Sequence, residues 1–269
     1  MPRIARPLAA ALIGAVALSS LAGCAKNKGK LDTTYVARDV DTLYNAAKDK
    51  FERQQYKDAA QLFDEVERQH PYSVWARRAQ LMSAFSYYMA RKYSESIQSA
   101  QRFISVHPGN KDAPYALYLI SLDYYEQIQD VTRDQKVTQQ ALDALGEVAR
   151  RYPDTKYATD ARLKIDLVND HLAGKDMEIG RFYERTGNWL AATLRFRNVV
   201  EHYQTTSHAP EALYRLTETN LALGIPEEAK KYAAVLGANY PGNVWYERAF
   251  DLMREKAPQV AAIAAAKAS

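Results

Sequence analysis

A small residue recurs at one position of a repeating pattern along most of this chain, and an apolar residue follows it four positions later. The small members are Ala59, Ser96, Ala141, Ala192 and Ala229. The residue four positions later projects from the same face of a helix, and it is large at Phe63, Leu145 and Phe196. A proline then follows in four of the five sets, at Pro71, Pro108, Pro153 and Pro241. Proline ends a helix because it lacks an amide hydrogen and disfavours helical geometry in its predecessor, so the pattern predicts five helical pairs.

The fourth set carries the most complete pattern. Residues 180–196 read GRFYERTGNWLAATLRF, which matches the G-x2-Y…A-x3-F pattern of tetratricopeptide repeats. The second set follows the first by 37 residues, and the third follows the second by 45, because residues 127–139 add polar sequence. A single pair cannot bury its apolar stripe alone, so stacked pairs are needed for stability. We therefore expect an all-α solenoid of about five tetratricopeptide pairs.

Two segments depart from the repeat. Residues 157–186 are too long for one ordinary repeat helix and predict a single extended helix, loosened at Gly174. After Pro241, the stretch NVWYERAFDLMREKA predicts a C-terminal capping helix whose inner face carries Tyr246, Phe250 and Met253. The alanine-rich residues 257–269 are expected to form a flexible tail.

The amino terminus has the layout of a secretory signal. Arg3 and Arg6 precede an apolar run over 8–18, and small residues follow up to position 23. The run is shorter than the roughly 18 residues that a membrane-spanning helix needs. We expect residues 1–23 to be a signal peptide, 24–36 a lipidated terminus and linker, and 37–256 the solenoid.

Cys24 is the only cysteine in the chain. The phrase LAGC at 21–24 resembles the lipobox of bacterial lipoproteins, in which the cysteine is acylated and becomes the first residue after cleavage. A buried thiol or an intermolecular disulfide are the other uses of a lone cysteine, but this position borders a removable leader. Ala25 follows where aspartate commonly signals inner-membrane retention, so the resemblance implies a lipid anchor in the outer membrane, facing the periplasm.

The sequence carries no motif for catalysis. It has no glycine-rich phosphate loop, no H-E-x-x-H and no G-x-S-x-G, and His70 and His107 each precede a proline, as turn residues do. We expect no enzyme activity, no metal and no cofactor. The formal charge of +4 falls to +2 without the leader, which holds two arginines and no acid. Because this net charge is small and both signs are interspersed, the sequence does not indicate a surface that binds nucleic acid.

The nineteen tyrosines cluster in the first three repeats. Eight residues of the predicted first helices fall at positions that usually line the concave surface of tetratricopeptide arrays: Tyr44, Phe51, Leu81, Phe85, Tyr88, Tyr115, Tyr118 and Tyr125. Either these side chains pack against neighbouring helices, or they line a groove for an extended peptide. In a groove each ring would offer apolar area and each tyrosine a hydroxyl. The sequence leaves both interpretations open.

Longer phrases resemble the tetratricopeptide lipoprotein family of the outer-membrane β-barrel assembly machinery. They are YKDAAQLFDEVERQHPYSVWARRAQL at 56–81, HPGNKDAPYALYLISLDYY at 107–125, RRYPDTKYATDARLKID at 150–166 and YERTGNWLAATLRFRNVVEHY at 183–203. The resemblance spans about 35–255. It implies a lipoprotein that binds unfolded outer-membrane β-barrel proteins, the barrel subunit BamA and other assembly lipoproteins.

The same resemblance places the BamA contact in the last two repeats. By position, our candidates are Glu211 and Arg215, polar residues that we expect on an exposed face of the first helix of the fifth pair, followed by Arg195 and Arg197. A rival interpretation is a tetratricopeptide adaptor that scaffolds peptidoglycan enzymes in the periplasm. A second rival is a hydrolytic or transferase activity within 127–139, although that segment holds no nucleophile and base at a useful spacing.

Overall fold

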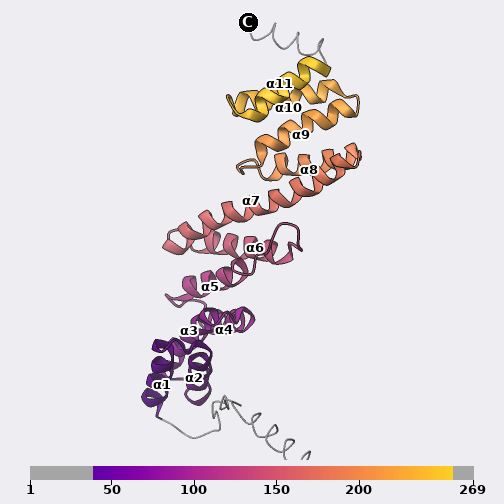
Figure 1. Cartoon of the computed structure of the whole chain (residues 1–269). Coiled ribbons are helices and arrows are strands. Elements are labelled where there is room, and N and C mark those ends of the chain that lie inside the picture. Colours follow the sequence, from indigo (N-terminus) through magenta and orange to yellow (C-terminus); the bar gives the residue numbers. More distant parts are fainter. Residues whose placement is uncertain (1–38, 257–269) are drawn as a thin grey trace, which may run out of the picture. The chain divides into compact units, whose positions relative to one another are not determined.

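The computed structural model describes residues 39–256. This part of the chain forms eleven α-helices that follow one another as a stack (Figure 1). Their bounds are α1 (Val40–Glu52), α2 (Tyr56–Gln69), α3 (Val74–Met89), α4 (Tyr93–Val106), α5 (Ala113–Tyr125), α6 (Lys136–Arg151), α7 (Lys156–Arg185), α8 (Trp189–His202), α9 (Ala209–Ala222), α10 (Pro226–Asn239) and α11 (Val244–Lys256). The signal peptide at 1–23, the lipidated terminus and linker at 24–36, and the tail at 257–269 lie outside the described residues.

Each helix packs mainly against its neighbours in the chain. The first helices of successive pairs also touch, so α1 contacts α3, α3 contacts α5, and α5 contacts α7. Beyond the fifth pair, α11 packs against α9 and α10. This arrangement confirms the all-α solenoid of five helical pairs with a C-terminal capping helix. No helix in the described part is both long and apolar enough to cross a bilayer.

The repeat pattern marks the contacts between the two helices of each pair. All five small residues, from Ala59 to Ala229, are completely buried. The large residues Phe63, Leu145 and Phe196 are also completely buried, so they fill the space between helices as the pattern predicts. Side chains fix the start of some helices. For example, the Oγ of Ser73 accepts a hydrogen bond from the backbone N–H of Ala76 at 3.0 Å, which caps α3.

The long helix α7 runs without a break through Gly174, so the expected loosening there is wrong. A Cβ on Gly174 would lie 3.1 Å from Nε2 of His208, and one on Gly180 would lie 2.4 Å from the ring of Phe196. Both glycines therefore provide close approach, to the start of α9 in one case and to α8 in the other.

The inner face of α11 differs from the expected one. Phe250 is 51% exposed, whereas Ala249 is completely buried and Met253 nearly so. The ring of Tyr246 packs directly over Gly237 of α10, where a Cβ would lie 2.6 Å from it. The small Ala249 lets α11 lie close to its neighbours, and the larger Phe250 turns outward.

Candidate functional site

A continuous row of aromatic rings crosses the first helices of the first four repeats. We call Phe51, Phe85, Tyr88, Tyr115, Tyr118 and Tyr157 the aromatic ladder. Ring centroids lie 5.7 Å apart for Phe51 and Phe85, 6.5 Å for Phe85 and Tyr115, and 5.6 Å for Tyr115 and Tyr157. Tyr88 lies 6.3 Å from Phe85, and Tyr118 lies 5.3 Å from Tyr157. The row exists because α1, α3, α5 and α7 lie side by side.

Every member of the aromatic ladder is half-buried, so each ring packs against its neighbours and still presents part of its surface. Burial raises the pKa of Tyr115 to about 12, and burial together with a hydrogen bond to Asp160 raises the pKa of Tyr118. The same hydrogen bond lowers the pKa of Asp160, which also pairs with Lys164 at 3.1 Å. The hydroxyls of Tyr115 and Tyr118 are therefore neutral at physiological pH, and that of Tyr118 donates to Asp160.

Five of the eight residues expected on the concave surface belong to the aromatic ladder, and three do not. Tyr44 is a correction, because it is only 8% exposed and packs in the core, with its ring 4.6 Å from that of Trp75. Tyr125 is half-buried under Lys164, whose ammonium lies 5.3 Å from its ring centroid. Leu81 is half-buried. Sequence reasoning missed Tyr157, which joins Tyr115 to Tyr118.

A buried carboxyl group lies behind the aromatic ladder. Asp123 of α5 is completely buried, and neither of its carboxyl oxygens has a hydrogen-bond partner among the described residues. The nearby hydroxyl of Ser96 donates instead to the carbonyl oxygen of Ala84, at 2.9 Å. Burial raises the pKa of Asp123 to about 8, and Ser96 acts only weakly in the other direction. The carboxyl group is thus mostly protonated at neutral pH.

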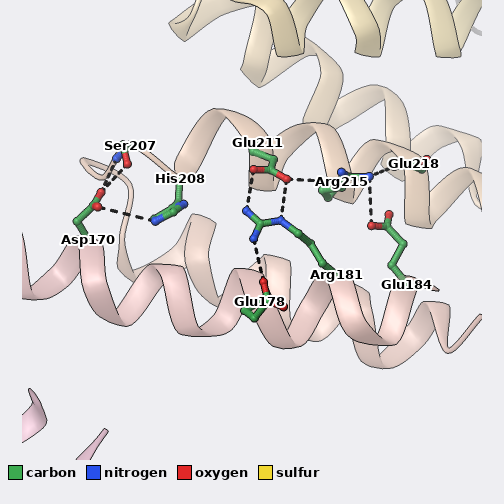
Figure 2. Close-up of polar contacts among 9 residues, drawn as sticks. All are labelled: Asp170, Glu178, Arg181, Glu184, Ser207, His208, Glu211, Arg215 and Glu218. Carbon is green, nitrogen blue, oxygen red and sulfur yellow. Dashed lines mark hydrogen bonds and ion pairs between the residues drawn. The ribbon is translucent and has the colours of Figure 1, made fainter. Parts of the chain in front are cut away.

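A charged network joins α7 to α9 in the C-terminal half (Figure 2). Arg181 binds Glu211 through two hydrogen bonds, of 3.0 and 2.9 Å, in the bidentate geometry that arginine favours. Arg215 contacts Glu184 at 3.2 Å, Glu218 at 2.9 Å and Glu211 at 3.4 Å. These side chains thus connect neighbouring repeats.

The network shifts the protonation of its carboxyl groups in opposite directions. Burial opposes ionisation of Glu211, but hydrogen bonds and charge from Arg181 and Arg215 lower its pKa overall. Burial raises the pKa of Glu184 to about 7, despite Arg215 beside it. One oxygen of Glu184 has no hydrogen-bond partner in the described structure.

The four candidate docking residues lie in different surroundings. Glu211 and Arg215 are half-buried inside the network, so the expectation that they stand on an exposed helix face is wrong. Arg195 pairs with Asp176 at 3.1 Å. Arg197 is exposed, and it shares one face of α8 with Leu190 and Leu194, which are 65% and 55% exposed. We call Leu190, Leu194 and Arg197 the α8 face.

Residues 36–236 match a family model described as YfiO: Outer membrane lipoprotein. The chain belongs to this family. It is 52% identical to the outer membrane protein assembly factor BamD of Caulobacter vibrioides, over 94% of this chain and 82% of that protein. It is 46% identical to the protein of the same name from Rickettsia prowazekii, over 87% of this chain and 92% of that one. Among solved structures, a thermophilic TPR protein of Thermus thermophilus is similar at 18% identity, covering 78% of this chain and 98% of that one, with a TM-score of 0.36.

Family membership confirms the expectation of a non-enzymatic lipoprotein of the outer membrane. The relatives are named as assembly factors, so they favour neither the peptidoglycan adaptor nor the transferase or hydrolase considered from the sequence.

Proposed function

We propose that this lipoprotein holds unfolded outer-membrane β-barrel proteins on its aromatic ladder while its C-terminal repeats dock on BamA. Acylated Cys24 would anchor it in the outer membrane, within a complex that contains the other assembly lipoproteins. The observation that carries the proposal is the unbroken row of half-buried rings from Phe51 to Tyr118 across four repeats.

The spacing of these rings suits an extended peptide. In a β-strand, side chains on one face recur every second residue, which is about 6.6 Å. Neighbouring rings of the aromatic ladder lie 5.3 to 6.5 Å apart. A strand of a membrane β-barrel alternates apolar and polar residues, so its apolar face can contact successive rings. Until such a strand is paired, its open edge is an aggregation hazard, and an occupied ladder would shield it.

The first test removes the central ring. We expect Phe85→Ser to weaken binding of a fluorescent peptide, copied from the carboxy-terminal strand of an outer-membrane β-barrel protein, by about ten-fold, because one aromatic anchor of an interface contributes roughly 1–2 kcal/mol. Fluorescence anisotropy measures the dissociation constant. Phe250→Ser is the matched control, since Phe250 is an exposed phenylalanine on α11. Equal affinities for Phe85→Ser and the unaltered protein would contradict the proposal.

The α8 face is our proposed contact for BamA, because exposed leucines beside an exposed arginine are typical of an interface core with a charged edge. We expect Leu190→Asp together with Leu194→Asp to reduce the BamA recovered with the lipoprotein from detergent-solubilised membranes by about ten-fold or more. Both side chains are exposed, so the thermal unfolding midpoint should change little.

Leu163→Asp with Leu167→Asp is the matched control for this second test. These leucines are also four positions apart, and they are 63% and 60% exposed on α7. Loss of BamA in both double variants would point to a general effect of charge rather than to the α8 face. Recovery of peptidoglycan enzymes in place of BamA from the unaltered protein would favour the adaptor.

A further inference from the structure

The α2–α3 loop and the α4–α5 loop lie at the same edge of the solenoid, where α1 begins. The ring of Tyr44, near the start of α1, packs against Trp75, near the start of α3. The starts of α1 and α3 are therefore neighbours, and the loop between α2 and α3 lies beside them. A hollow of about 510 Å³ joins this loop to the end of α4, since Pro71, Tyr72 and Val74 line it together with Val106 and His107.

This edge carries the two most exposed large apolar side chains of the described residues. Tyr72 is fully exposed, at 101%, and Val74 is 75% exposed. Val106, the last residue of α4, is 64% exposed. Large apolar side chains that are exposed together on one edge are a feature of surfaces that contact a partner or a membrane.

Basic side chains lie on the same helix start and on the neighbouring loop. Arg77 and Arg78 are exposed on the first turns of α3, and Lys111 is exposed on the loop before α5. Glu67, at the bottom of the hollow, accepts a hydrogen bond from Gln80 at 3.0 Å and lies 3.9 Å from Arg102. Its charge is therefore balanced within the protein. The basic part of the edge is formed by Arg77, Arg78 and Lys111, and exposed Asp39 and Asp41 form an acidic part at the start of α1.

We propose that this edge, formed by Tyr72, Val74, Val106, Arg77, Arg78 and Lys111, lies on the anionic phospholipid surface of the membrane that anchors the protein. Tyrosine favours the membrane–water interface, because its ring is apolar and its hydroxyl is polar. Basic residues beside it are attracted to anionic headgroups.

The anchor argues for a bilayer as the occupant of this edge. Only 14 residues separate Cys24 from Asp39, which caps α1 at this same edge. Fourteen residues can span at most about 50 Å, so a lipid on Cys24 holds this edge within about 50 Å of the bilayer surface. The inference thus rests on the proposed acylation of Cys24, and it adds a second contact that fixes how the solenoid faces the membrane.

The test uses the full lipidated protein in vesicles of phosphatidylethanolamine and phosphatidylglycerol. A nitrobenzoxadiazole label on Tyr72→Cys should fluoresce at shorter wavelength than in water and should be quenched by nitroxide-labelled lipid. The same label on Lys92→Cys is the control, because Lys92 is exposed on the α3–α4 loop at the opposite edge; it should behave as in water. Acylated Cys24 does not react with the label.

A second measurement keeps Tyr72 in place and reads the label from Lys111→Cys. Tyr72→Ser with Val74→Ser should reduce lipid quenching there. The equilibrium constant for contact between this edge and the bilayer should fall about ten-fold. Tyr72→Phe should retain most of the quenching. Replacing phosphatidylglycerol by phosphatidylcholine should weaken it.

Flotation on a density gradient separates the two ways of failing. A chain that does not float with the vesicles contradicts the anchor at Cys24, and the inference with it. A chain that floats while a label at position 72 stays in water overturns the inference alone.

Discussion

Replacing Asp123 by asparagine should stabilise the protein increasingly as the pH rises from about 4 to about 8. The reason is the buried carboxyl group behind the aromatic ladder. Its pKa is raised from 3.8 to about 8 because burial penalises the charged form. Asparagine has a similar shape and carries no charge at any of these pH values, so it does not incur this penalty.

The direction follows from the protons bound in each state. Between pH 4 and pH 8, Asp123 is protonated in the folded chain and ionised in the unfolded chain, so raising the pH favours unfolding. Below pH 4 both states are protonated, and above pH 8 both are ionised. Each pH unit inside the window contributes at most about 1.4 kcal/mol. We therefore expect a difference of about 2–4 kcal/mol between the variant and the unaltered protein at pH 7.

Chemical denaturation of both proteins from pH 4 to pH 8 measures this difference. Other carboxyl groups with shifted pKa values, such as Glu184, contribute equally to the pH dependence of unfolding in both proteins. Their contribution therefore cancels in the difference between the two. Asp166→Asn is the control, because Asp166 is an exposed carboxylate on α7. A constant gap between Asp123→Asn and the unaltered protein across the pH range would show that Asp123 ionises normally in the folded state.

Gly180→Ala, which adds a single methyl group, should lower the free energy of unfolding by about 1–3 kcal/mol. Its Cβ would lie 2.4, 2.8 and 2.9 Å from three ring carbons of Phe196. The ring cannot move away easily, because Phe196 is completely buried in a cluster with Met177, Val199 and Leu216. Relief therefore requires α8 to shift away from α7.

A double-mutant cycle identifies the cause. Phe196→Leu alone should cost about 1 kcal/mol, but combined with Gly180→Ala it removes the clash, so the double variant should be more stable than the sum of the single effects predicts. Gly146→Ala is the matched control in α6. There the nearest atom to a new Cβ is the end of Arg150 at 4.0 Å, so alanine should stabilise the helix by about 0.5–1 kcal/mol. Additive effects of Gly180→Ala and Phe196→Leu would contradict the proposed clash.

The fold could be predicted from the sequence because its determinants are local. Each small residue and its partner four positions later lie on one helix, and each terminating proline acts on its own turn. The error at Phe250 shows the limit of this reasoning. Positions 249 and 250 are both close to the apolar stripe of α11, and the decision between them depends on how much room α9 and α10 leave.

The candidate surfaces depend on distances between repeats, which spacing within a helix does not encode. Tyr157 was missed because its place beside Tyr115 and Tyr118 follows from the packing of α7 against α5. Glu211 and Arg215 look like an exposed pair on α9. Their partners Arg181 and Glu184 come from another helix, so the sequence of α9 contains no sign of the network.

The uninterrupted course of α7 has a mechanical consequence. Tyr157, at its beginning, belongs to the aromatic ladder, and Arg181, near its end, belongs to the network with α9. At a rise of 1.5 Å per residue these positions are about 36 Å apart along one axis. Because no loop separates them, one continuous helix sets the distance between the aromatic ladder and the network with α9. A displacement of Tyr157 along the axis of α7 therefore also moves Arg181.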